Sequence, residues 1–97
     1  MDKEARDAIN KAFREAFLRV VEEIGPEFRS IERSADSRLE AARGSLDYGE
    51  AELAFNTLIE NIYEWDLKVS AETKRDLKFM ATQVGMLDHA ANNGRYW

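Results

Sequence analysis

Apolar residues recur at steps of three and four along most of this chain, which is the spacing of one face of an α-helix. The clearest case is the segment 3–24, where charged side chains fill the positions between the apolar ones. Its apolar positions are Ala5, Ile9, Ala12, Phe13, Ala16, Phe17, Val20, Val21 and Ile24. No stretch shows the strict alternation of a β-strand. The sequence therefore predicts an all-α fold.

Two breaks in this pattern delimit the first two predicted helices. The first helix, 3–24, ends at Gly25-Pro26, because Gly suits the position after a helix and Pro suits the first turn of the next one. A kink in a continuous helix is the alternative interpretation of the same dipeptide. The second helix, 27–43, has only a thin apolar stripe and is predicted to be the least buried, and Gly44-Ser45 closes it.

The third predicted helix covers residues 47–65. It opens with Asp47 at the N-cap and Glu50 three residues later, which is the pattern of a capping box. Its core-facing residues are Ala51, Ala54, Phe55, Leu58, Ile59 and Ile62. The fourth helix follows an N-cap at Ser70 and fades near His89, and its apolar residues are Leu77, Met80, Ala81, Val84 and Leu87.

A chain of 97 residues is long enough for one hydrophobic core and too short for two domains of ordinary size. The connections between the predicted helices are short, and short connections make consecutive helices antiparallel neighbours. Residues 1–97 are therefore predicted to form a single domain, a small antiparallel bundle of three to four helices.

The negative charge of the chain is concentrated in one segment. The whole chain carries 19 acidic and 14 basic residues, for a net charge of −5, and residues 47–66 hold six of the acids with no Lys or Arg. Such a block makes a local field that attracts a basic partner. The predicted partner-binding residues are Tyr48, Glu52, Asn56, Glu60, Tyr63, Glu64, Trp65 and Asp66. The alternative is an ordinary solvated face whose charge is relieved by Lys68, Lys74, Arg75 and Lys78.

Composition argues against several other kinds of site. Cysteine is absent, which excludes disulfides and thiolate catalysis. The one histidine, His89, belongs to no catalytic motif, and neither a phosphate loop nor a Glu-x-x-His pair occurs. We therefore expect no enzyme, no metal and no cofactor. The N-terminus lacks a secretory signal and no apolar run could span a bilayer, so we expect a cytoplasmic protein with no membrane partner.

The acidic segment and the helix after it resemble a family of small bacterial immunity proteins, which includes the MafI-like proteins and those of contact-dependent growth inhibition and other polymorphic toxin systems. Its pattern is a Gly-Glu turn, a helix with an Ala-Leu step and a Leu–Glu–Leu-Tyr-Glu-like run, then a short loop and a Ser-capped helix. The matching residues are Gly49-Glu50, Ala54-Phe55, Leu58, Glu60, Ile62-Tyr63-Glu64 and Val69-Ser70. The first half of the chain matches only in being helical.

The resemblance implies a protein that binds and neutralises the toxin domain of its own cognate effector. Such toxin domains are often nucleases, and a nuclease that holds a polyanion tends to present a basic cleft. The acidic helix would either occupy this cleft or bind outside it, with Tyr63 and Trp65 as apolar anchors. The alternative function is that of a helical adaptor or regulatory module that binds another protein and is unrelated to toxins.

Two further surfaces come from the second predicted helix. Its arginines could contact nucleic acid, but the acids Glu32, Asp36 and Glu40 dilute this positive stripe, so we expect no direct nucleic-acid binding. The arginines concerned are Arg29, Arg33, Arg38 and Arg43. Any exposed part of its apolar stripe could instead mark a homodimer face, formed by Phe28, Ile31 and Leu39. The aromatic pair Tyr96 and Trp97 either folds back on the bundle or lies loose.

Overall fold

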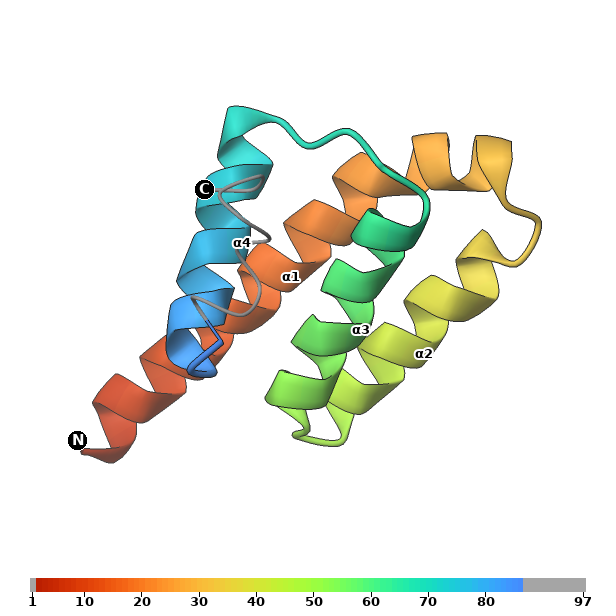
Figure 1. The fold of residues 1–97 in the computed structure, drawn as a ribbon. Helices are drawn as coiled ribbons and strands as arrows, with labels where there is room; N and C mark the ends of the chain where they lie inside the picture. The colour runs from red at the N-terminus through yellow and green to blue at the C-terminus, as the bar shows by residue number, and fades with distance from the viewer. Residues whose placement is uncertain (1, 87–97) are drawn as a thin grey trace.

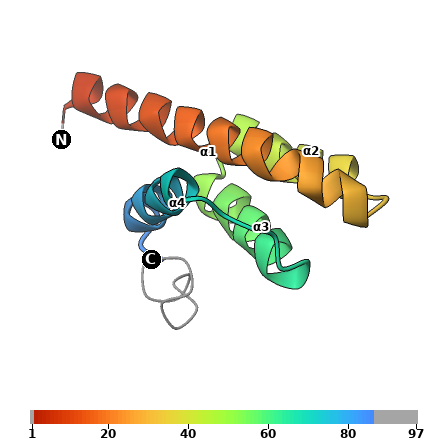
Figure 2. The same ribbon diagram turned by 90° about the horizontal axis from the view of Figure 1, so that it is seen from above.

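The computed structural model describes residues 2–86 and shows an all-α bundle of two layers (Figures 1 and 2). The back layer of Figure 1 holds α1 (Lys3–Ile31) and α2 (Ala35–Asp47), and the front layer holds α3 (Ala51–Glu64) and α4 (Ala71–Gln83). Contacts join α2 to α3, α1 to α4 and α1 to α2. The predicted fold class, a small helical bundle, is confirmed. No helix in the described part of the chain is long and apolar enough to cross a membrane.

The first helix does not end at Gly25-Pro26. It continues through both residues to Ile31 (Figure 1), so the predicted boundary was wrong. Proline has no N–H to donate within the helix, and a proline in a helix interior costs about 3 kcal/mol. Continuing the helix buries Phe28 completely and packs its ring against that of Trp65, with the ring centroids 5.2 Å apart and the ring planes tilted by 44°. These contacts offset a cost of that size, because burying a Phe contributes about 1.5–3 kcal/mol and an aromatic pair adds about 1 kcal/mol.

The core is built around a stripe of side chains along α1, the helix against which α2 and α4 pack. Each member of the stripe is at most 5 % exposed: Phe13, Ala16, Phe17, Val20, Ile24 and Phe28. Leu39 of α2, Phe55 of α3 and Leu77 of α4 belong to the same buried cluster. The helical period read from the sequence therefore identified the core face of α1 from Phe13 to Ile24, whereas Ala5 at its beginning is exposed. The stripe also extends beyond the predicted end of the helix.

The predicted capping box at Asp47 was wrong, because α2 runs through Gly44-Ser45 and ends at Asp47. The turn that follows is a Schellman motif: Gly49 has a φ of +79°, and the Glu50 N–H donates to the Ser45 carbonyl at 2.9 Å. The side chain of Asp47 instead accepts a hydrogen bond from Arg14 of α1 at 2.7 Å. Helix α3 then starts at Ala51 with Glu50 at its N-cap, where no side chain caps it.

Two carboxylates of α1 hold the connection between α3 and α4 and the first turn of α4. The side chain of Glu27 accepts from the Lys68 N–H at 2.8 Å, and Glu23 accepts from the hydroxyl of buried Thr73. Ser70 caps α4 as predicted, because its hydroxyl oxygen accepts from the Thr73 N–H at 3.1 Å. The two carboxylates hold in place the segment at which α4 begins.

Helix α4 ends at Gln83, earlier than the predicted fading near His89. A second Schellman motif stops it, with Gly85 at a φ of +70°. His89, the predicted core residue Leu87 and the aromatic pair of Tyr96 and Trp97 lie outside the described residues.

The predicted homodimer face does not form a continuous exposed surface. The second predicted helix, 27–43, is divided between the end of α1 and the later start of α2 at Ala35. Phe28 and Leu39 are buried inside the bundle, and only Ile31, at 53 %, is exposed. Their burial removes two of the three side chains on which that hypothesis depended.

Replacing Gly25 by Ala should leave the protein folded and raise its stability slightly. Alanine favours a helix interior over glycine by about 0.5–1 kcal/mol. A Cβ at Gly25 would lie 2.8 Å from the end of the Arg29 side chain. Moving that side chain loses only its 3.4 Å contact with Asp36, an exposed pair worth about 0–1 kcal/mol. Urea unfolding followed by circular dichroism measures the change.

Gly44→Ala is the matched control, since Gly44 lies within α2 and a Cβ there meets nothing within 4 Å. It should therefore show the full helix-propensity gain and exceed Gly25→Ala. A loss of more than about 1 kcal/mol on Gly25→Ala alone would mean that this glycine is required by the packing of α1, contrary to our interpretation.

Candidate functional site

The acidic side chains of α3 lie on its solvent-facing side, opposite the buried face. Glu52, Glu60 and Glu64 are exposed, whereas Ala54 and Ile62 on the opposite face are fully buried. Positions 52, 56, 60 and 64 follow one another at four-residue steps, so their side chains form one continuous stripe. The half-buried Asn56 donates to the Glu60 carboxylate at 3.1 Å within this stripe. The predicted surface is therefore accessible over the length of the helix.

The three α3 carboxylates have no ion-pair partner among the described residues. The ion pairs there join Lys11 to Glu15, Arg14 to Asp47, Arg19 to Asp76, Arg29 to Asp36 and Arg75 to Glu72. None of the predicted relieving cations on α4 or in the loop before it reaches an acid of α3. The cation that does lie beside the stripe is Arg38 of α2, which lines a small notch together with Glu60 and Glu64.

Trp65 is part of the folded framework as well as of the predicted partner-binding surface. It is half-buried, its ring packs on Phe28 at 5.2 Å, and the Arg38 guanidinium lies 4.4 Å above it. This stacking uses the ring face that an interface anchor would offer to a partner. Tyr63 is also half-buried and packs against the core cluster.

Asp66 is exposed, and its backbone helps to end α3. Its φ of +50° lies in the left-handed region, and the Leu67 N–H donates to the Ile62 carbonyl at 3.0 Å. This arrangement is a third Schellman motif, in which Asp takes the position that Gly usually occupies. Asp66 therefore has a structural role that its negative charge did not reveal.

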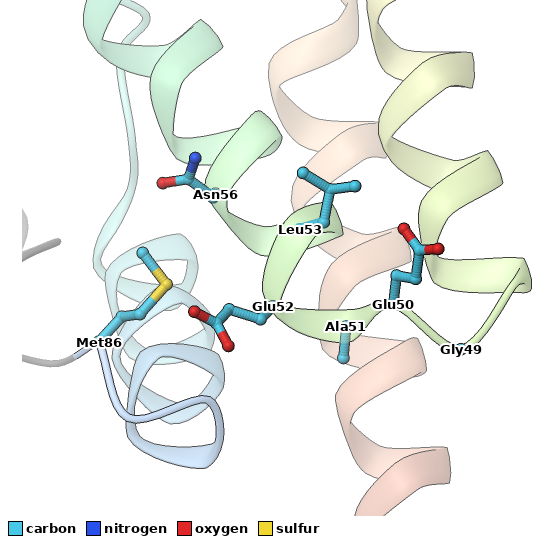
Figure 3. A pocket seen from close by; sticks show the side chains of 7 residues that line it. All are labelled: Gly49, Glu50, Ala51, Glu52, Leu53, Asn56 and Met86. Atoms are coloured by element: carbon cyan, nitrogen blue, oxygen red, sulfur yellow. The ribbon is translucent and has the colours of Figure 1, made fainter.

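The beginning of α3 offers a different kind of surface, with apolar and acidic groups side by side. Tyr48 is 87 % exposed and Leu53 is 49 % exposed. Beside them lies a shallow depression of about 690 Å³ between the start of α3 and the segment after α4 (Figure 3). Its lining residues are Gly49, Glu50, Ala51, Glu52, Leu53, Asn56 and Met86. In Figure 3 the carboxylate of Glu52 lies on the side of the helix that faces Met86.

The predicted site residues thus divide into two groups. Tyr48, Glu52 and Asn56 lie at or beside the depression, whereas Glu60 and Glu64 line the notch beside Arg38 at the other end of α3. Glu50, Leu53 and Met86 also belong to the first group and were not among the predicted partner-binding residues. Gly49 was the available signal, because a glycine after an apolar helical run marks a helix end and would have placed Glu50 outside α2.

The remaining candidate chemistries find little support in the geometry. Within residues 2–86 no group of three or more His, Cys, Asp or Glu side chains is placed to hold a metal ion. Two of the four arginines considered for nucleic acid already have partners, Arg29 with Asp36 and Arg38 with Trp65.

Comparisons with protein-family models, curated proteins and solved structures gave no match. The resemblance to immunity proteins therefore stays a prediction based on the residues quoted above.

Trp65→Ala should destabilise the fold, because it removes the contact with Phe28 and the stacking of Arg38. Truncating a fully buried Trp costs about 3–5 kcal/mol, so a half-buried one should cost about 2–3 kcal/mol. Tyr48→Ala is the matched control at an exposed aromatic and should change stability by less than about 0.5 kcal/mol. Chemical denaturation of both variants measures the difference. Equal stability of the two would show that Trp65 is not a packing residue.

Proposed function

We propose that this protein is an immunity protein that binds and neutralises a basic toxin domain, of the nuclease class, in the cytoplasm. The observation that carries the proposal is the stripe of exposed carboxylates on α3, at Glu52, Glu60 and Glu64, which have no ion-pair partner in the described part of the chain. The resemblance to immunity proteins covers this same helix.

An acidic stripe without ion pairs slightly destabilises its own helix and favours a basic partner. Like charges four residues apart on a helix, such as Glu60 and Glu64, destabilise it by a few tenths of a kcal/mol. A partner that supplies Lys or Arg removes this repulsion on binding. Complementary charge also steers the encounter and raises the association rate, and salt screens the effect. The proposed complex should therefore form quickly and weaken as salt is added.

A nucleic-acid-binding cleft is the type of surface that fits this face. Such clefts present Lys and Arg that neutralise the phosphates of the nucleic acid. Carboxylates spaced along a rigid helix can replace those phosphates without offering a bond to cleave. In this mechanism the protein excludes the substrate by occupying or covering the cleft, and it needs no catalytic residue of its own.

The test is a pull-down with the tagged full-length chain from a lysate of the organism that encodes it, at low and at moderate salt, with mass spectrometry of the retained proteins. We expect one stoichiometric partner that corresponds to the C-terminal domain of a large secreted protein, released by salt. Glu52→Gln, Glu60→Gln and Glu64→Gln together should weaken its binding at least about tenfold, because close charge pairs contribute strongly to such complexes.

The matched control changes the net charge equally at exposed sites on α1 and α2, with Asp7→Asn, Glu22→Gln and Glu40→Gln. It should retain the partner as the unaltered chain does. Co-expression of the captured domain with each variant then tests neutralisation directly by cell survival. Recovery of cytosolic regulators alone would support the adaptor function instead, and equal binding by both triple variants would refute the role of the acidic stripe.

A further inference from the structure

A recess lies at the end of the bundle where three parts of the chain converge. The first half of α1, the α2–α3 turn and the end of α4 enclose a volume of about 370 Å³, and all three lie at the same end of the molecule in Figure 1. The lining residues are Ile9, Asn10, Phe13, Arg14, Leu46, Gly49, Ala51, Gln83 and Val84. This recess is more enclosed than the depression at the start of α3, with which it shares Gly49 and Ala51.

The lining of the recess is mainly apolar, and its polar groups are few. Phe13, Leu46 and Val84 supply apolar surface, and Phe13 belongs to the core. Arg14 is already engaged, since it donates to Asp47 at 2.7 Å. A recess of this kind suits an apolar side chain, which gains free energy in proportion to the area removed from water. The volume exceeds that of a single aromatic side chain.

Charge around the recess indicates what kind of segment would bring that side chain. Glu50 and Glu52 line the adjoining depression, and neither forms an ion pair among the described residues. Tyr48 and Leu53 stand exposed on the same turn and helix start. An apolar side chain flanked by Lys or Arg would fill the recess and meet these carboxylates together. Buried aromatic anchors of this type carry much of the free energy of protein interfaces.

We propose that this recess is an anchor site, and that its occupant is a basic segment of the protein partner that inserts a large apolar side chain, such as Phe, between α1, the α2–α3 turn and α4. The inference rests on the proposed function and specifies where on this chain the partner is held. The apolar contacts with the partner would therefore lie near the start of α3. At the other end of α3, the Trp65 ring already contacts Phe28 and Arg38. The acidic stripe then orients the rest of the partner.

The test uses two synthetic peptides and the full-length protein, with affinity measured by fluorescence anisotropy. One peptide is Lys-Arg-Lys-Phe-Lys-Arg-Lys, and the other has Ala in place of Phe with the same charge. We expect the Phe peptide to bind about tenfold more tightly, which corresponds to burying one aromatic side chain. Amide resonances of Gly49, Ala51 and Val84 should shift with the Phe peptide and not with the Ala peptide.

Asn10→Trp blocks the recess without changing charge, because Asn10 is exposed and lines it. This variant should bind the two peptides equally. Ser37→Trp, at an exposed position of α2 outside the lining, is the matched control and should keep the tenfold preference. Equal binding of both peptides by the unaltered chain, or a preference that survives Asn10→Trp, would overturn the proposal.

Two other occupants would also overturn it, and each has its own signature. Cross-peaks between Trp97 and Phe13 in the free protein would show that the chain's own C-terminal segment fills the recess. A dimer that Asn10→Trp dissociates, seen by sedimentation, would show that a second copy does. Failure of the proposed function is distinguishable, because the pull-down would then yield no toxin domain, or would retain it equally with the triple Glu→Gln variant, while the unaltered chain still preferred the Phe peptide.

Discussion

The whole bundle depends on the unbroken apolar stripe of α1. From Phe13 to Phe28 this stripe passes through Gly25-Pro26, and both α2 and α4 pack against the helix that carries it. A helix that stopped at Gly25 would leave Phe28 without a fixed position and Trp65 without the ring that packs against it. The turn into α2 would then begin earlier, and α2 and α3 would pack at a different position along α1. Burial of the Phe28 ring is thus one of the contacts that position α2 and the end of α3 on α1.

The elements that were predictable from sequence are those with strong local signals. The buried face of α3 from Ala54 to Ile62 follows from its period, and the Ser70 cap follows from its side chain. The errors came from residues with two local meanings. Asp47 can begin a helix or end one, and Pro26 can start a helix or lie within it. In both cases a distant contact determines which role the residue takes. Asp47 ends α2 and pairs with Arg14 of α1, and the helix continues past Pro26 to Phe28, whose ring packs against Trp65.

The candidate site was predictable as a helix face and not as a set of contacts. Counting charges located the acidic segment correctly, and the stripe of Glu52, Glu60 and Glu64 is exposed. Which cation would approach it depended on helix arrangement, and Arg38 of α2 lies there instead of Lys74 or Lys78 of α4. The role of Trp65 in packing could not be read from the sequence, because only the fold brings Phe28 and Arg38 close to it. The role of Asp66 in ending α3 is local, but Asp is not the residue that usually marks such a helix end.

The two helix pairs that join the layers, α2 with α3 and α1 with α4, differ in how far apart in sequence their contacting residues lie. Helices α2 and α3 are neighbours across one tight turn, whereas Arg19 and Asp76, which pair at 2.9 Å between α1 and α4, are 57 positions apart. Closing such a long loop costs more entropy than forming a hairpin. Helix α4 should therefore dock last during folding and detach first in local opening. Each such event removes one wall of the recess, so the lifetime of the recess is tied to the docking of α4.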